Sequence, residues 1–270
     1  MTTDIEIAVA DGVQVIRFLR AGKKNAFTGA MYNAMSAALD AAESNEAIAV
    51  HLFIGSGGVF SAGNDINDFL RRAEASGQRE AKGDGQDGIP APSLDFIRRL
   101  PKVSKPMIAA VDGLAVGIGT TLLLHCDLVY ASPSASLRTP FLDLGLVQEA
   151  GSSLLAPERL GYPLAFELIC LGEPFTAERA LNARLINAIV PAAELEATAL
   201  AAARRLVAKP RQALMSARRL LRRNQAAIGS VIDEEANCYK ELMASPEARE
   251  AFTAFLEKRP PNFAKARTAR

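Results

Sequence analysis

The chain has 270 residues, of which 49% are hydrophobic, and a formal net charge of +1. A chain of this length can bury one large core, and its near-zero charge favours neither nucleic acid nor a membrane surface as a partner. No apolar run approaches the roughly 18 residues of a membrane span. The acidic first twelve residues also exclude a secretory signal.

Cysteine and histidine usage argues against metal or redox chemistry. Cys126, Cys170 and Cys238 are far apart and share no metal-ligand spacing, so we expect reduced, mostly buried thiols in a cytoplasmic protein. His51 and His125, the only histidines, lie in apolar stretches and are expected to be structural. A Ser-His-Asp site is therefore not supported, and no metal site is expected.

The first fifty residues predict β-β-α-β order. Residues 5–9 and 13–19 alternate in polarity around Asp11-Gly12, which is the pattern of a β-hairpin. Thr28 can cap a helix whose apolar residues recur at helical spacing up to about Glu43. Residues 50–54 form an apolar run that predicts a buried strand.

The first segment with features of a functional site is residues 55–70, GSGGVFSAGNDINDFL. Glycines turn the chain after the strand, and residues 62–64 then place backbone N–H groups at the mouth of a helix that begins near Ile66. Asp65 could cap that helix. Residues 71–92, rich in charge and glycine, predict a mobile loop, and residues 94–100 predict a helical turn.

The central stretch, residues 105–132, predicts a strand (107–111), a turn at Asp112-Gly113, a glycine loop, a helix (120–126) and a strand (128–130). Gly117 and Gly119 at a helix mouth would expose unpaired amides that favour negative charge. The loop lacks lysine and P-loop spacing, so a developing oxyanion suits it better than a nucleotide triphosphate. The alternative is that the glycines only allow tight helix–sheet packing.

Glu149 is the only acid among the apolar and small residues between Leu144 and Pro157. Desolvation should raise its pKa, which suits a general base. The alternative is a solvent-facing glutamate at a helix start, because most glutamates are exposed.

The C-terminal part is predicted to be mostly helical. A helix at 165–171, a half capping box at Thr176 and a strand at 186–190 precede a helical region, which gives a core of residues 1–193 and an appendage of residues 194–270. A basic run in the appendage predicts a solvated helix face, with a nucleic-acid role as the minor reading. The run comprises Arg218, Arg219, Arg222 and Arg223.

Taken together, several segments resemble the crotonase superfamily, also called the enoyl-CoA hydratase/isomerase family. The resemblance covers nearly the whole chain in the family's order and rests on these pieces: KKNAF (23–27), FSAGNDI (60–66), residues 105–132, LGLVQEAGSS (144–153), residues 171–190 and FLEKRPPNF (255–263). It implies an α/β fold, a crotonase-like spiral of ββα units with a C-terminal helical trimerisation region. It further implies homotrimers or dimers of trimers, and acyl-CoA thioester substrates whose coenzyme A is part of the substrate rather than a cofactor.

Site residues also follow from this resemblance. The two backbone amides of the family's oxyanion hole fall at Asn64 and Ile118, next to Gly63 and Gly117. The two glutamates that activate water in hydratases fall at Thr121 and Phe141, neither of which is an acid. Glu149 lies in QEAGSS, which is similar to the PEGxSS segment of Δ3,Δ2-enoyl-CoA isomerases, where one glutamate carries the proton. The expected substrate contacts are Lys23, Ala26, Ala62, Gly63, Asp65, Ile66, Gly117, Thr121, Phe141, Leu142 and, near the coenzyme A phosphates, Lys258 of the same or a neighbouring subunit.

We therefore expect isomerisation of a 3-enoyl-CoA to the 2-enoyl-CoA through a dienolate, with Glu149 as the proton carrier. Two alternatives stay open. One is a 2-enoyl-CoA hydratase or other crotonase chemistry. The other is a non-catalytic acyl-CoA-binding or RNA-associated homologue, in which the basic helix would matter and Glu149 would not.

Overall fold

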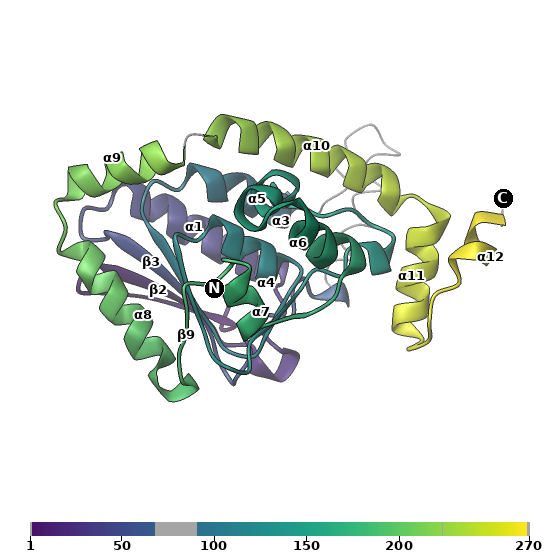
Figure 1. Cartoon of the computed structure of the whole chain (residues 1–270), viewed down its shortest axis with the longest axis horizontal. Coiled ribbons are helices and arrows are strands. Elements are labelled where there is room, and N and C mark those ends of the chain that lie inside the picture. Colours follow the sequence, from purple (N-terminus) through teal and green to yellow (C-terminus); the bar gives the residue numbers. More distant parts are fainter. Residues whose placement is uncertain (1, 68–90, 223, 269–270) are drawn as a thin grey trace.

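The computed structural model describes residues 2–67, 91–222 and 224–268. Its main sheet has six strands in the order β1-β2-β3-β4-β6-β9 (Figure 1). The hairpin expected around Asp11-Gly12 is confirmed, because β1 and β2 pair antiparallel and both turn residues have positive φ. The other neighbouring strands pair in parallel. The strands are β1 (Ile5–Ala10), β2 (Val13–Phe18), β3 (Val50–Gly55), β4 (Met107–Val111), β6 (Leu128–Ala131) and β9 (Ala188–Ile189).

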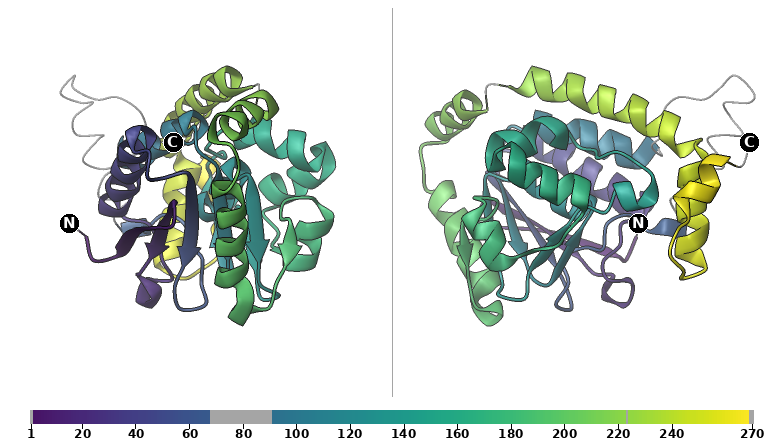
Figure 2. Two further views of the ribbon diagram at one scale, coloured as in Figure 1. Left: turned by 90° about the vertical axis from the view of Figure 1, so that its left-hand side faces the viewer. Right: turned by 45° about the vertical axis from the view of Figure 1, so that its right-hand side comes forward.

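The central strands are buried on both faces, which explains why they appear in the sequence as continuous apolar runs. In β3, Val50, Leu52 and Ile54 belong to a small core under α8 (Ala192–Val207), whereas Phe53 belongs to the large core on the other face. The large core lies between the sheet and the helices α1 (Gly29–Ser44) and α3 (Ala91–Arg99). Figure 2 shows α8 and α1 on opposite sides of the sheet.

A second, three-stranded sheet lies beside the glycine loop of the central stretch. It has the order β5-β7-β8 and pairs β5 (Leu114–Val116) with β7 (Ser136–Arg138) in parallel. The helix expected at 120–126 is divided in two: α4 covers Ile118–Thr121, and a 3₁₀ turn covers Leu122–His125. The guanidinium of Arg159 donates to the carbonyls of Leu123, Leu124 and Cys126, which ties down this tighter turn.

The remaining helices enclose the core and extend past it. Thr28 and Thr176 cap α1 and α7 as expected, each accepting a hydrogen bond from a first-turn amide. The long helix α10 crosses the molecule from α9 to α11 (Figure 1). None of the described helices combines the length and the hydrophobicity that a membrane-crossing segment needs. Their bounds are α5 (Ser152–Leu160), α6 (Tyr162–Phe166), α7 (Ala177–Asn182), α9 (Arg211–Leu221), α10 (Gln225–Met243), α11 (Pro246–Leu256) and α12 (Phe263–Thr268); β8 is Phe175–Thr176.

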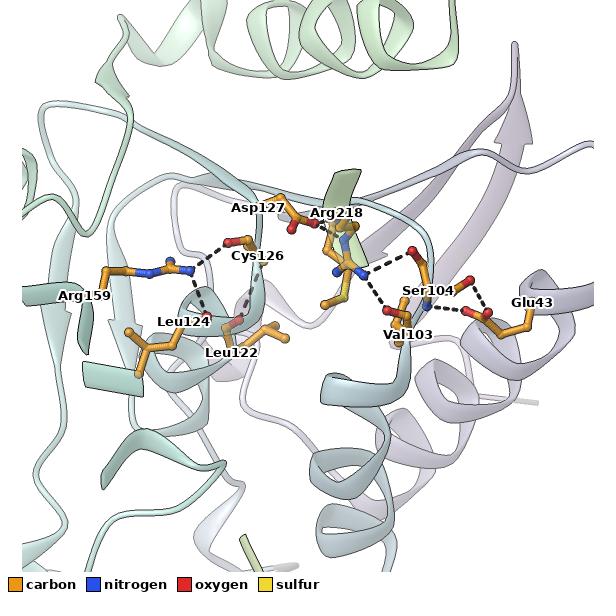
Figure 3. Close-up of polar contacts among 10 residues, drawn as sticks. Glu43, Val103, Ser104, Leu122, Leu124, Cys126, Asp127, Arg159 and Arg218 are labelled. Carbon is orange, nitrogen blue, oxygen red and sulfur yellow. Dashed lines mark hydrogen bonds and ion pairs between the residues drawn. The ribbon is translucent and has the colours of Figure 1, made fainter. Parts of the chain in front are cut away.

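The basic run on α9 is not a solvated face, so that expectation is wrong. The side chain of Arg218 is only 5% exposed, and its Nε donates to Asp127 Oδ2 at 2.8 Å. Its Nη1 donates to the carbonyls of Val103 and Ser104 (Figure 3). Arg222 is half-buried, and burial followed by the charge of Arg218 lowers its pKa to about 10. Arg219 alone of the described members is exposed; Arg223 lies outside the described residues.

The expectation of structural histidines is confirmed, whereas that of mostly buried cysteines is wrong. All three cysteines are free, but only Cys126 is buried; Cys170 is half-buried and Cys238 is exposed. Both histidines are buried, and burial lowers the pKa of each to about 3. Neutral His51 pairs with Gln14 Oε1 and His125 with the Ala150 carbonyl, as expected of structural residues.

Candidate active site

Two glycine-bearing loops from different parts of the sequence meet at one place. A short parallel bridge pairs Ser61 with Ala115. A Cβ on Gly63 would lie 2.7 Å from the Val116 carbonyl oxygen, and a Cβ on Gly119 would lie 2.9 Å from that of Ser61. Such distances exclude a side chain at either position. The packing alternative for the glycines therefore holds for Gly119, and this packing brings the segments of Asn64 and Ile118 together.

The amides of Asn64 and Ile118 have no partner among the described residues. Phe27 bonds to both neighbours of Asn64, donating to the Gly63 carbonyl at 2.7 Å and accepting from Asp65 N at 2.9 Å. This bridge turns the N–H of Asn64 itself to the opposite side. Ile118 is the first residue of α4, so its N–H has no intrahelical acceptor. Two unpaired backbone donors are thus available to an oxygen that gains negative charge.

Both amide-bearing residues line a cavity of about 330 Å³. Of the residues expected at the substrate, Ala62, Gly63, Ile66, Gly117 and Phe141 also line it. The wall is completed by Val116, Arg138, Pro140, Asp143, Leu144, Tyr239, Ala251, Phe252, Phe255, Arg259 and Pro261. The α11 segment of the same chain therefore forms one side of the cavity, and most of the lining is apolar.

Six of the expected substrate residues do not line this cavity. One of them, Thr121, is buried and donates to Glu149. Asp65 forms an ion pair with Arg20 at 2.8 Å. Ala26 is buried below the loop, Lys23 and Lys258 are exposed, and Leu142 is 41% exposed. Two cations do line the cavity: Arg138, which ion-pairs with Asp143 at 2.9 Å, and Arg259, which ion-pairs with Glu250 at 2.6 Å.

Glu149 is buried, with 2% of its surface exposed, just before the start of α5. Thr121, at the end of α4, donates to its Oε1 at 3.3 Å. Burial, and after it the charge of Glu235, raise the pKa of Glu149 to about 8, with the Thr121 hydroxyl opposing the shift. The expected rise in pKa is confirmed, and the solvent-facing alternative is excluded. The carboxyl does not itself line the cavity and lies beside Thr121.

Three further polar residues surround Glu149 and were not expected from the sequence. Tyr32 on α1 donates its hydroxyl to Asn64 Oδ1 at 2.5 Å, which fixes one of the two amide-bearing residues. Tyr239 on α10 lines the cavity. Burial and then the charge of Glu149 raise the pKa of both phenols. Glu235, also on α10, is buried close to Glu149.

A pattern in the sequence could have indicated two of them. Ile228, Ile232 and Ala236 recur at helical spacing and are buried in the core. Glu235 and Tyr239 fall on the same stripe, so polar atoms on them must face the interior. No such signal marks the pairing of Tyr32 with Asn64. Across the described residues, no three His, Cys, Asp or Glu side chains are grouped as a metal site.

Comparisons with known proteins agree with this architecture. The profile of the enoyl-CoA hydratase/isomerase family matches residues 8–266. A crystal structure of an enoyl-CoA hydratase/isomerase from Pseudoalteromonas atlantica T6c superimposes with a TM-score of 0.87 at 32% identity, covering 97% of this chain and all of that one. The expected crotonase-like α/β fold with C-terminal helices is confirmed.

Curated relatives differ in their reactions. Enoyl-CoA delta isomerase 2 of Rattus norvegicus is 31% identical over 92% of this chain, which spans 62% of that longer protein. The 2,3-dehydroadipyl-CoA hydratase of Escherichia coli is 30% identical over 93% of this chain and 94% of its own length. Identities this similar do not decide between the two reactions, but both relatives act on coenzyme A thioesters. The chain therefore belongs to the enoyl-CoA hydratase/isomerase family, the crotonases, and is an enzyme of acyl-CoA thioesters.

Proposed function

We propose that this enzyme isomerises 3-enoyl-CoA thioesters to 2-enoyl-CoA thioesters. The observation that carries the proposal is the buried carboxyl of Glu149, whose pKa is raised to about 8, together with a cavity that two unpaired amides line. One base with a pKa near working pH is sufficient to remove a proton and to return it elsewhere.

In the proposed mechanism, the thioester oxygen binds to the amides of Asn64 and Ile118. The acyl chain reaches past the cavity wall so that Glu149 removes a proton from C2. The electron pair delocalises over the dienolate, and its charge on the thioester oxygen is stabilised by the two donors. Protonated Glu149 then gives the same proton to C4, and the double bond moves into conjugation with the thioester. The reaction consumes no water, metal or redox cofactor.

The residues at the hydratase positions favour isomerisation over hydration. Thr121 and Phe141 occupy the places where, by resemblance, hydratases carry glutamates, and neither can take a proton from water. Thr121 instead donates to Glu149. A 2-enoyl-CoA hydratase would need Glu149 alone to activate water. That reaction is the second candidate, since a hydratase is among the relatives.

The rest of the substrate is assigned by the same proposal. The coenzyme A moiety leaves the cavity near Ala62 and Arg259, with Lys23, Ala26 and Lys258 outside it. Residues 194–270 would form the trimerisation region of a homotrimer or a dimer of trimers in the cytoplasm. Size-exclusion chromatography with light scattering tests the assembly.

The deciding experiment gives the purified protein two substrates. With 3-hexenoyl-CoA, isomerisation increases the absorbance of the conjugated thioester; with crotonyl-CoA, hydration decreases it. Glu149→Gln keeps the shape of the side chain but removes the base, so we expect the isomerase kcat to fall about 10²–10⁴-fold with the fold unchanged by circular dichroism.

The matched control is Glu173→Gln, which removes an exposed carboxylate outside the site and should leave kcat unchanged. Full isomerase activity in Glu149→Gln would remove Glu149 from the mechanism. Hydration without isomerisation would favour the second candidate. Binding of coenzyme A thioesters with no turnover of either substrate would indicate a non-catalytic homologue.

A further inference from the structure

Glu235 binds the turn that carries Glu149. It lies on α10, is 6% exposed, and reaches the first residues of α5. Its Oε2 accepts from Gly151 N at 2.7 Å, and its Oε1 accepts from Ser153 N at 2.9 Å and from the Ser153 hydroxyl. These amides are among the donors that a helix start leaves unpaired. One carboxylate thus supplies the cap that α5 lacks from its own Ncap residue, Gly151.

The turn needs such an anchor because its backbone is unusual. Ala150 has a φ of 63° and Gly151 a φ of 69°, and a positive φ at Ala150 is unfavourable for a residue with a side chain. The Ala150 carbonyl bonds to His125 Nε2 at 2.7 Å, and the Ser152 hydroxyl donates to the Glu149 carbonyl at 2.6 Å. The position of the Glu149 side chain therefore depends on contacts made by α10 and by the 3₁₀ turn after α4.

The hydrogen bonds also decide which of the two buried carboxyls ionises first. Glu235 accepts three hydrogen bonds, whereas Glu149 accepts one, at 3.3 Å from Thr121. Burial raises the pKa of both carboxyls. Because donors stabilise the charged form, Glu235 ionises at lower pH than Glu149. The titratable groups around the pair are Tyr32 on α1, neutral His125 after α4, and Tyr239 and Glu234 on α10.

We propose that Glu235 is a positioning residue for the reaction: it fixes the turn that presents Glu149 and holds a carboxylate charge close to it. The inference rests on the proposed role of Glu149 as the proton carrier. It assigns to α10 a contribution to chemistry in addition to packing. The pKa of Glu149, raised to about 8 with Glu235 as its second cause after burial, is consistent with this geometry.

Three variants separate charge from anchoring. Glu235→Gln removes the charge at constant size and also one of the acceptors. We expect the acidic limb of its kcat/KM profile to move to lower pH by about one unit and kcat to fall about tenfold. Glu235→Asp keeps the charge but withdraws it by one methylene, so its shift should be smaller while kcat still falls. Glu234→Gln removes an exposed neighbouring charge on the same helix and should leave both unchanged.

An infrared titration provides a readout that needs no turnover. The carbonyl band of protonated Glu149 is identified by its loss in Glu149→Gln, and its midpoint is followed with pH in each variant. We expect the midpoint to be highest in the wild type, lower in Glu235→Asp and lowest in Glu235→Gln. An unchanged midpoint in Glu235→Gln, or an equal shift in Glu234→Gln, overturns the inference. If Glu235→Gln does not fold, an unchanged midpoint in Glu235→Asp overturns the inference instead.

The two assays keep the two proposals apart. Absence of isomerase activity in the wild-type protein would refute the proposed function, yet the infrared midpoints would still decide whether Glu235 controls the ionisation of Glu149. Conversely, an active wild-type enzyme with a midpoint independent of Glu235 would keep the function and remove the inference.

Discussion

At the scale of single residues, the buried carboxyl of Glu149 links stability to pH. Its pKa is about 8 in the folded chain, against the ordinary value of 4.5 expected after unfolding. Between these values the folded state binds more protons than the unfolded state, so the free energy of unfolding falls as pH rises. The contribution is complete below about pH 4.5 and is lost as pH rises through 8.

Glu149→Gln should remove most of this dependence, because an amide does not ionise. As pH rises from 5 to 9, the free energy of unfolding of the variant should increase by a few kcal/mol relative to that of the wild type. Urea unfolding at both pH values measures this change. Glu173→Gln, which removes an exposed carboxylate, should follow the wild type. Equal pH slopes in all three proteins would show that Glu149 ionises at an ordinary pKa.

At the scale of elements, the buried side chain of Arg218 helps to attach α9 to the core. Arg218 bonds to Asp127, which also accepts from Met107 N at 2.8 Å at the start of β4. The same guanidinium bonds to two carbonyls that follow α3. Arg218 thus combines one ion pair with two hydrogen bonds to carbonyls, and removing one partner of such a pair leaves the other uncompensated.

Arg218→Ala is expected to lower the free energy of unfolding by about 2–4 kcal/mol. This expected loss is smaller than that for a fully buried ion pair, because the side chain of Asp127 is partly exposed. Arg219→Ala, one residue further along α9 and exposed, should change it by less than about 0.5 kcal/mol. Urea unfolding of both variants is the measurement. Similar losses in both would mean that α9 is held by its apolar contacts instead.

The elements also show how far sequence patterns reach. The apolar runs of β3 and β4 and the caps at Thr28 and Thr176 were predictable, because strand burial and helix capping are local properties. The surroundings of Arg218 were not, since its partner Asp127 is 91 residues away and local charge density indicated solvent. Glu149 was predictable as a lone acid among apolar neighbours. The helical stripe marks Glu235 as facing the interior, but the proximity of Glu235 and Tyr32 to Glu149 was not predictable, because only the tertiary fold brings α10 and α1 to it.

At the scale of the whole molecule, the cavity exists only because the end of the chain returns to the core. Its inner wall comes from the loops around Gly63 and Gly117, and its outer wall comes from α11 and the residues after it. Ala248, Ala251 and Ala254 are buried, so α11 presents small side chains where it packs. At Gly145 the backbone of the core lies close to α11, because a Cβ there would be 2.9 Å from Ala248 N.

Gly145→Ala should therefore open the cavity without touching its inner wall. Two costs apply: a side chain at a φ of +70°, and a clash with the backbone of α11. Gly172→Ala is the matched control, because Gly172 has a φ of +64° and a ψ of 19°, close to the +70° and 23° of Gly145, and its added Cβ would make only ordinary contacts of 3.6 Å or more. Both variants should lose about 1 kcal/mol of stability from the backbone. Only Gly145→Ala should also weaken binding of hexanoyl-CoA, by about tenfold, in isothermal titration calorimetry. Equal affinities in the two variants would mean that α11 does not enclose the acyl chain.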